Sequence, residues 1–142
     1  MKITKQKIYL TFAGVILSLV GAYISLAPSD YLNQFGLANQ SSLELFSELR
    51  GMGGNLLVFG LFVLLGAFYQ KIESTAIVIS ALVFSSFSVF RVIGIVVDGI
   101  PGEGILFALI IEMTFAFLAI IILRQTRASH APQLPNSQSQ VV

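Results

Sequence analysis

The chain has 142 residues, of which 56% are hydrophobic and 11% are charged. Polar side chains are too few to cover a soluble domain of this size, so the composition predicts an integral membrane protein. The formal net charge of +1 argues against nucleic acid as a partner, and the absence of cysteine excludes disulfides, thiolate metal sites and cysteine nucleophiles.

Four apolar runs of membrane-spanning length alternate with short polar connections. Runs of this kind predict an all-α integral membrane protein, a four-helix bundle. The expected spans are residues 8–27, 49–69, 76–97 and 105–123. Together they form one transmembrane domain over residues 1–124.

The first run follows three lysines and is longer than the ~7–15 apolar residues of a signal peptide, so we expect an uncleaved span. Small residues recur along one of its helical faces, which predicts a packing seam for another backbone. These residues are Gly14, Ser18, Gly21 and Ser25. The seam is compatible with packing inside one bundle or between subunits.

The longest connection, residues 28–47, is expected to hold a short interfacial helix. Residues 30–37 read as a helical turn that ends at Gly36. Ser41 and Glu44 then have the spacing of a capping box, which predicts that the next helix begins near residue 42.

The later spans carry isolated polar residues. The second span begins with Arg50 and contains Asn55, the third contains Arg91, and the fourth contains Glu112. Asp98 opens the turn between the third and fourth spans. Residues 125–142 are rich in Pro, Ser, Gln and Asn, which predicts a disordered cytoplasmic tail.

Loop charges predict the orientation, because Lys and Arg mark the cytoplasmic side of a membrane. One side holds six basic residues, whereas the connections on the other side hold five acidic residues and only Arg50 at the membrane edge. The basic residues are Lys2, Lys5, Lys7, Lys71, Arg124 and Arg127. Both termini are therefore expected in the cytoplasm.

Several motifs resemble those of a family of small bacterial four-span membrane proteins that is described only as a domain of unknown function. Residues 43–55 read LELFSELRGMGGN, residues 90–94 read FRVIG, residues 98–99 read DG, and Glu112 follows in the last span. The resemblance covers about residues 8 to 124. It implies the fold and a place in the bacterial inner membrane, and it implies no activity.

The deepest polar groups of the spans are Asn55, Arg91 and Glu112. At ~1.5 Å per residue, each lies ~9–11 Å from the non-cytoplasmic end of its helix, so the three share one layer. A lone charge at that depth costs roughly 2.5–3.5 kcal/mol. We therefore predict that Arg91 pairs with Glu112 and that Asn55 bridges them.

A polar cavity in the outer half of the bundle is the predicted site. Ser18, Gly21 and Ser25 of the first span reach the same depth, and Arg50 lies near Glu48, Asp98 and Glu103. The candidate ligand-binding residues are Arg50, Asn55, Arg91, Asp98 and Glu112. We expect no catalytic residue, metal or cofactor.

The function stays open between several classes. The first is a site for a small amphiphilic or anionic molecule, with the arginines as cations. An ion pair that only fixes helix register, in a structural or assembly subunit of a membrane complex, is the alternative. A proton-coupled transporter or a membrane enzyme that uses Glu112 as general acid or base is less favoured. Expected partners are the lipid bilayer, a lipid-like or small anionic ligand, and a second copy or another membrane protein.

Overall fold

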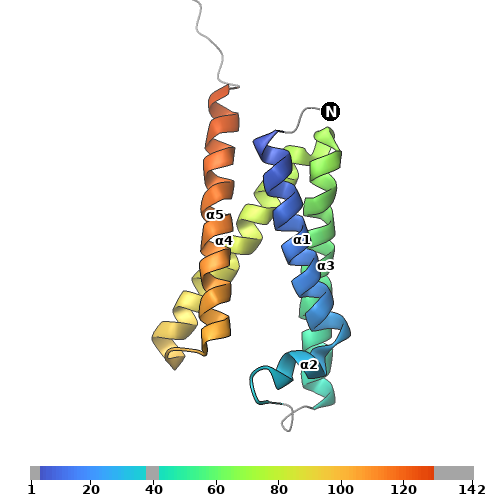
Figure 1. Cartoon of the computed structure of the whole chain (residues 1–142), viewed down its shortest axis with the longest axis vertical. Helices are drawn as coiled ribbons and strands as arrows, with labels where there is room; N and C mark the ends of the chain where they lie inside the picture. The colour runs from blue at the N-terminus through green and yellow to red at the C-terminus, as the bar shows by residue number, and fades with distance from the viewer. Residues whose placement is uncertain (1–3, 38–41, 130–142) are drawn as a thin grey trace, which may run out of the picture.

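The computed structural model describes residues 4–37 and 42–129. Its elements are helices, and the described residues contain no strand, so the predicted all-α class is confirmed (Figure 1). In chain order they are α1 (Lys5–Leu26), α2 (Pro28–Asn33), α3 (Leu43–Phe68), the 3-10 turn η2 (Gln70–Ile72), α4 (Glu73–Asp98) and α5 (Glu103–Ser129).

Four of these helices are long and apolar enough to cross a membrane. Each overlaps one predicted span. Helix α3 begins before residue 49 because Ser42 caps it, accepting a hydrogen bond from the Leu45 N–H at 3.2 Å. Ser41, the predicted cap, lies outside the described residues. Helix α5 continues to Ser129, into the range predicted as a tail, and residues 130–142 lie outside the described residues.

The predicted seam of α1 packs against α3 within the chain. A Cβ atom on Gly53 would lie 2.6 Å from the backbone nitrogen of Ser25, and a Cβ atom on Gly14 would lie 2.5 Å from that of Leu64. Ser18 lies against Gly60 in the same way. Small residues on both helices therefore bring the two backbones into direct contact.

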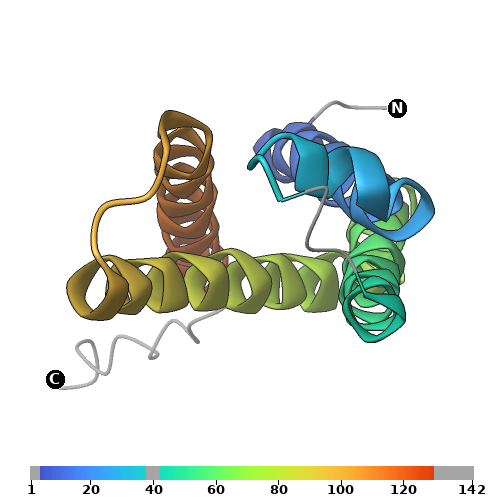
Figure 2. The same ribbon diagram turned by 90° about the horizontal axis from the view of Figure 1, so that it is seen from below.

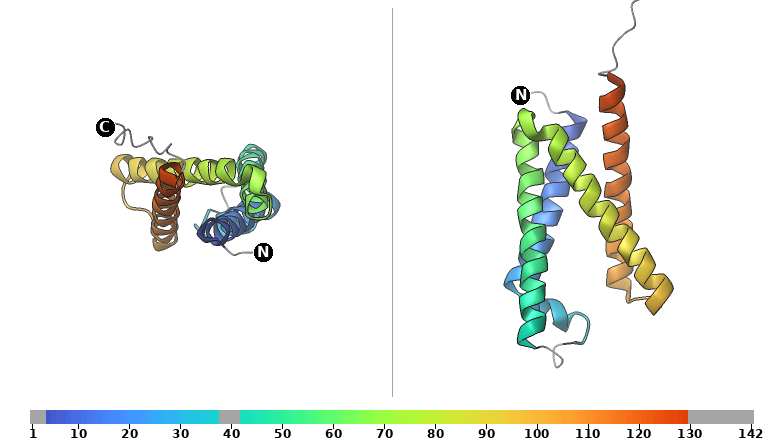
Figure 3. Two further views of the ribbon diagram at one scale, coloured as in Figure 1. Left: turned by 90° about the horizontal axis from the view of Figure 1, so that it is seen from above. Right: turned by 180° about the vertical axis from the view of Figure 1, so that it is seen from behind.

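The long helices form two antiparallel pairs, α1 with α3 and α4 with α5 (Figures 1 and 3). Helix α4 leaves the end of α3 through η2 and runs obliquely away from the first pair. The pairs thus meet at the end of the molecule where α1 begins, and they diverge toward the end that holds α2 (Figure 1). We call these the closed end and the open end.

Polar and aromatic contacts join the pairs near the closed end. The Tyr9 hydroxyl lies 2.9 Å from Ser80 Oγ on α4 and donates to the Phe115 carbonyl of α5 at 3.2 Å. The Phe115 ring stacks on that of Phe84, with centroids 5.0 Å apart. Tyr9 and Phe84 are both buried, so these contacts form a core shared by three helices.

Candidate functional site

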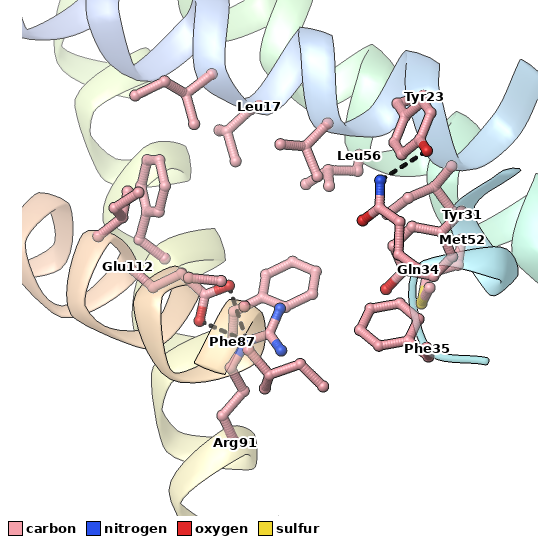
Figure 4. A pocket seen from close by; sticks show the side chains of 18 of the residues that line it. Leu17, Tyr23, Tyr31, Gln34, Phe35, Met52, Leu56, Phe87, Arg91 and Glu112 are labelled. Atoms are coloured by element: carbon pink, nitrogen blue, oxygen red, sulfur yellow. Dashed lines mark hydrogen bonds and ion pairs between the residues drawn. The ribbon is translucent and has the colours of Figure 1, made fainter. Parts of the chain in front are cut away.

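A cavity of about 720 Å³ lies between the diverging helix pairs. This volume is in the range of ~300–1,000 Å³ that is typical of small-molecule sites. Most of its lining side chains are apolar (Figure 4). They include Ile16, Leu17, Val20 and Ile24 of α1, Met52 and Leu56 of α3, Phe84, Phe87 and Phe90 of α4, and Ile105, Ala108 and Ile111 of α5.

The sequence predicted a polar cavity, and this feature of the prediction is wrong. Ser18, Gly21 and Ser25 were expected to contribute to the wall, but all three face the α1–α3 seam. The opposite side of α1, with its branched apolar residues, faces the cavity instead. The rotation of α1 about its own axis, and not the depth of each residue along the helix, determines which of its residues line the cavity.

Arg91 and Glu112 form an ion pair in the cavity wall, so the predicted pairing is confirmed (Figure 4). Nε of Arg91 donates to both carboxylate oxygens of Glu112, at 2.8 and 3.0 Å. The two side chains are 27% and 12% exposed, respectively. Each charge therefore offsets much of the unfavourable desolvation of the other.

The remaining donors of Arg91 are unused. Its two terminal nitrogens make no hydrogen bond to any residue in the described part of the chain. Figure 4 shows the guanidinium group turned into the cavity beside Phe87. The pair thus presents a set of N–H donors to a space with largely apolar walls.

The turn after α4 determines which residues of α4 and α5 lie opposite each other. Gly99 has φ +102° and ψ −178°, a conformation that is essentially restricted to glycine. Its N–H closes α4 by donating to the Ile95 carbonyl at 3.2 Å. Because α5 starts at Glu103, the short connection places Glu112 opposite Arg91 on the antiparallel helix.

Aromatic residues around α2 line the cavity at the open end. Gln34 donates to the Tyr23 hydroxyl at 2.7 Å. The Tyr31 ring meets those of Tyr23 and Phe35 edge to face, with centroids 6.2 and 5.1 Å apart. The side chains of Tyr23, Tyr31, Gln34 and Phe35 all line the cavity, so they are part of the candidate site. We call this group the aromatic rim.

Glu103, the first residue of α5, also lines the cavity. Its side chain is exposed, and it makes no ion pair with any residue that the structure describes. The sequence placed Glu103 near Arg50 in the predicted cavity, but it did not place the aromatic rim in the site. The available signal was the short helical turn at residues 30–37, which lies beside the cavity.

Asn55 does not bridge the ion pair, contrary to the prediction. Its side chain is exposed, does not line the cavity between the helix pairs and has no hydrogen bond within the described residues. Helix α3 faces α1 through Gly53, Leu57 and Gly60, and Asn55 lies about 200° around the helix from both Gly53 and Leu57, on the side away from α1.

Within the described residues, neither Arg50 nor Asp98 forms an ion pair or hydrogen bond with Arg91 or Glu112. Arg50 makes no ion pair with Glu48, Asp98 or Glu103; its Nη1 donates instead to the Ser25 carbonyl at 2.9 Å, near the C-terminal end of α1. Asp98 lines a second cavity of about 190 Å³, which also touches Arg91. Ligand binding by Arg50, Asn55, Arg91, Asp98 and Glu112 stays a prediction.

The arrangement offers hydrogen-bond donors from Arg91, acceptor oxygens from Glu112 and Glu103, and apolar surface. Within residues 4–37 and 42–129, no group of three or more His, Asp or Glu side chains is placed to hold a metal ion. The chemistry that these groups can provide is therefore recognition of a molecule with polar and apolar parts.

Comparison with known proteins gives one match. A family model described as a domain of unknown function (DUF4345) matches residues 5–123. No curated protein and no solved structure matches the chain. The matched range includes both partners of the ion pair and the aromatic rim.

Proposed function

The chain belongs to the family described as a domain of unknown function, DUF4345, and because that description carries no activity, we propose a function from the cavity. The protein is a multi-pass protein of the bacterial inner membrane that binds an amphiphilic molecule between its two helix pairs. The apolar part of the ligand lies along the cavity wall, and a polar group of the ligand accepts hydrogen bonds from Arg91.

The observation that carries this proposal is the orientation of the Arg91 guanidinium group. Only Nε is used by Glu112, while the terminal nitrogens face a cavity whose walls are mostly apolar. Arg91 is partly exposed, and its terminal nitrogens are not among the buried polar atoms that lack a partner, so they are accessible from the cavity. A ligand with an acceptor group can bind these donors, and its apolar part fills the rest of the space.

A purely structural ion pair fits the site less well. A pair that only fixes helix register is best buried between the two helices, with its remaining donors and acceptors satisfied there. Here the pair lies on the wall of a cavity that five helices line. The same groups are therefore placed both to hold α4 against α5 and to contact a ligand.

The membrane supplies a route for such a ligand. The outer faces of the long helices carry exposed apolar side chains, including Phe107, Ile110 and Val96, which suit contact with lipid. Among the helices that the structure describes, none lies between α1 and α5 at the open end (Figure 2). Ile16 and Val20 of α1 and Ala108 of α5 line the cavity with apolar side chains, so the proposed entry path leads from the bilayer between these two helices.

Native mass spectrometry of protein released from mild detergent tests the proposal. We expect a discrete adduct on the wild-type protein that is lost in Arg91→Ala. Arg50→Ala is the matched control, because Arg50 is also an arginine at the open end but does not line the cavity. Loss of the adduct in both variants, or in neither, would contradict a site at Arg91.

A second pair of variants separates ligand binding from the ion pair. Ala108→Trp fills the cavity and leaves Arg91 and Glu112 in place, so it should also remove the adduct. Met113→Trp, on the exposed side of the same helix, should retain it. An apo mass for the wild type, together with a co-purifying membrane protein, would favour an assembly subunit instead.

A further inference from the structure

The charged groups that line the cavity are not balanced in favour of anions. They comprise one cation, Arg91, and two carboxylates, Glu112 and Glu103. Arg91 already shares its charge with Glu112 through two hydrogen bonds. A ligand with a net negative charge would therefore enter a site whose own net charge is negative.

The ion pair behaves as a dipole rather than as a lone cation. An anionic group bound to the terminal nitrogens of Arg91 would sit close to the Glu112 carboxylate, whose repulsion opposes the attraction of the guanidinium. In surroundings of low polarity both interactions are strong. A ligand that brings a positive charge along with its negative charge avoids this conflict.

The open end provides a place for that positive charge. Glu103 faces the cavity there without a cationic partner in the described part of the chain. The aromatic rim, with Tyr23, Tyr31 and Phe35, lines the same cavity. A carboxylate together with aromatic rings is the combination that recognises ammonium groups, through charge and through cation–π attraction.

Glu103 and Glu112 line the same cavity at different levels of α5. Glu103 precedes Glu112 by nine residues on that helix, a rise of ~13 Å between their backbones. A single headgroup reaches both subsites when the exposed Glu103 side chain extends toward Arg91.

From these observations, and resting on the proposed function, we infer that the ligand is a zwitterionic amphiphile. Its phosphate or carboxylate group binds the terminal nitrogens of Arg91, and its ammonium group lies between Glu103 and the aromatic rim. The chemical class is that of lipids with a phosphocholine or phosphoethanolamine headgroup. Anionic lipids with the same tails are disfavoured by the two carboxylates.

A competition experiment tests this inference. The detergent-solubilised protein is given equal amounts of phosphatidylcholine and phosphatidylglycerol with identical acyl chains, and native mass spectrometry measures the ratio of the two adducts. We expect phosphatidylcholine to be retained in excess. Glu103→Gln should lower this ratio about three- to fivefold, the effect of losing one exposed charge contact.

Glu73→Gln is the matched control. Glu73 also occupies the first turn of a long helix, α4, where an acid is favoured by the helix dipole alone, but it does not line the cavity. The control should leave the lipid ratio unchanged. Thermal unfolding of each variant in the same detergent verifies that the exposed Glu103 can be replaced without unfolding the protein.

The outcomes distinguish the two proposals. Preference for phosphatidylglycerol, or a ratio that Glu103→Gln leaves unchanged, would overturn the zwitterionic inference. In either of those cases, if the wild-type protein binds both lipids and Arg91→Ala loses both, the cavity is still a lipid site and the proposed function stands. If neither lipid, nor any other adduct, is found on the wild-type protein, the proposed function itself fails.

Discussion

Nε of Arg91 donates to both carboxylate oxygens of Glu112, at 2.8 and 3.0 Å, and this contact ties α4 to α5 across the cavity wall. The first prediction concerns the contribution of this ion pair to the stability of the protein. Arg91→Met and Glu112→Leu should each lower the free energy of unfolding, by roughly 2–3 kcal/mol, because each leaves one charge without its partner in a partly buried site.

The double variant Arg91→Met/Glu112→Leu should recover much of that loss, since no unpaired charge remains. Unfolding by denaturing detergent in mixed micelles measures the free energy of unfolding of the wild type, the two single variants and the double variant. If the double variant were less stable than either single one, the contact would not be a mutually compensated ion pair. Ligand adducts should be absent from every variant that lacks Arg91, including the stable double variant.

The second prediction concerns the seam between α1 and α3. Gly53→Ala places a methyl group 2.6 Å from the backbone nitrogen of Ser25, so the two helices must separate. We expect a loss of about 1–3 kcal/mol, the usual effect of overpacking. The measurement is again unfolding in mixed micelles.

Gly51→Ala is the control for the seam. Gly51 lies on the same helix as Gly53, but a Cβ atom at Gly51 would meet nothing within 4 Å. This variant should match or exceed the wild type, since alanine favours a helix over glycine by roughly 0.5–1 kcal/mol. Equal effects of the two substitutions would contradict close backbone contact at Gly53.

The third prediction concerns the closed end. Tyr9→Phe keeps the buried ring but removes the hydroxyl that contacts Ser80 and the Phe115 carbonyl. It should lower the free energy of unfolding by about 0.5–1.5 kcal/mol per hydrogen bond lost. Tyr69→Phe, at an exposed tyrosine, should have no effect.

The adduct observed by native mass spectrometry should survive Tyr9→Phe, because Tyr9 does not line the cavity. Loss of both stability and adduct would indicate that the closed end sets the width of the cavity. Retention of full stability would show that the hydroxyl contacts contribute nothing measurable.

The sequence by itself determined the elements of this protein. Four helices follow from the length and apolarity of four runs, and the seam follows from small residues repeated on one face of α1. The Arg91–Glu112 pair was predictable because two opposite charges at one depth on consecutive antiparallel helices have few other partners. All of these are properties of single helices or of neighbours along the chain.

Tertiary structure decided which faces meet and where space remains. Counting residues gives the depth of Asn55 but not its direction, and the close contact at Gly53 turns Asn55 away from the cavity. Likewise Arg50 contacts the carbonyl at Ser25 instead of an acid, since the seam places the end of α1 beside it.

The divergence of the helix pairs has the same origin. Small residues hold α1 and α3 in contact along their length, whereas α4 approaches them chiefly near the closed end, through Tyr9 and Phe84. The space left at the open end, and the aromatic rim beside it, depend on the angle at which α4 leaves α3. That angle is set by contacts between residues far apart in the chain, which no local pattern records.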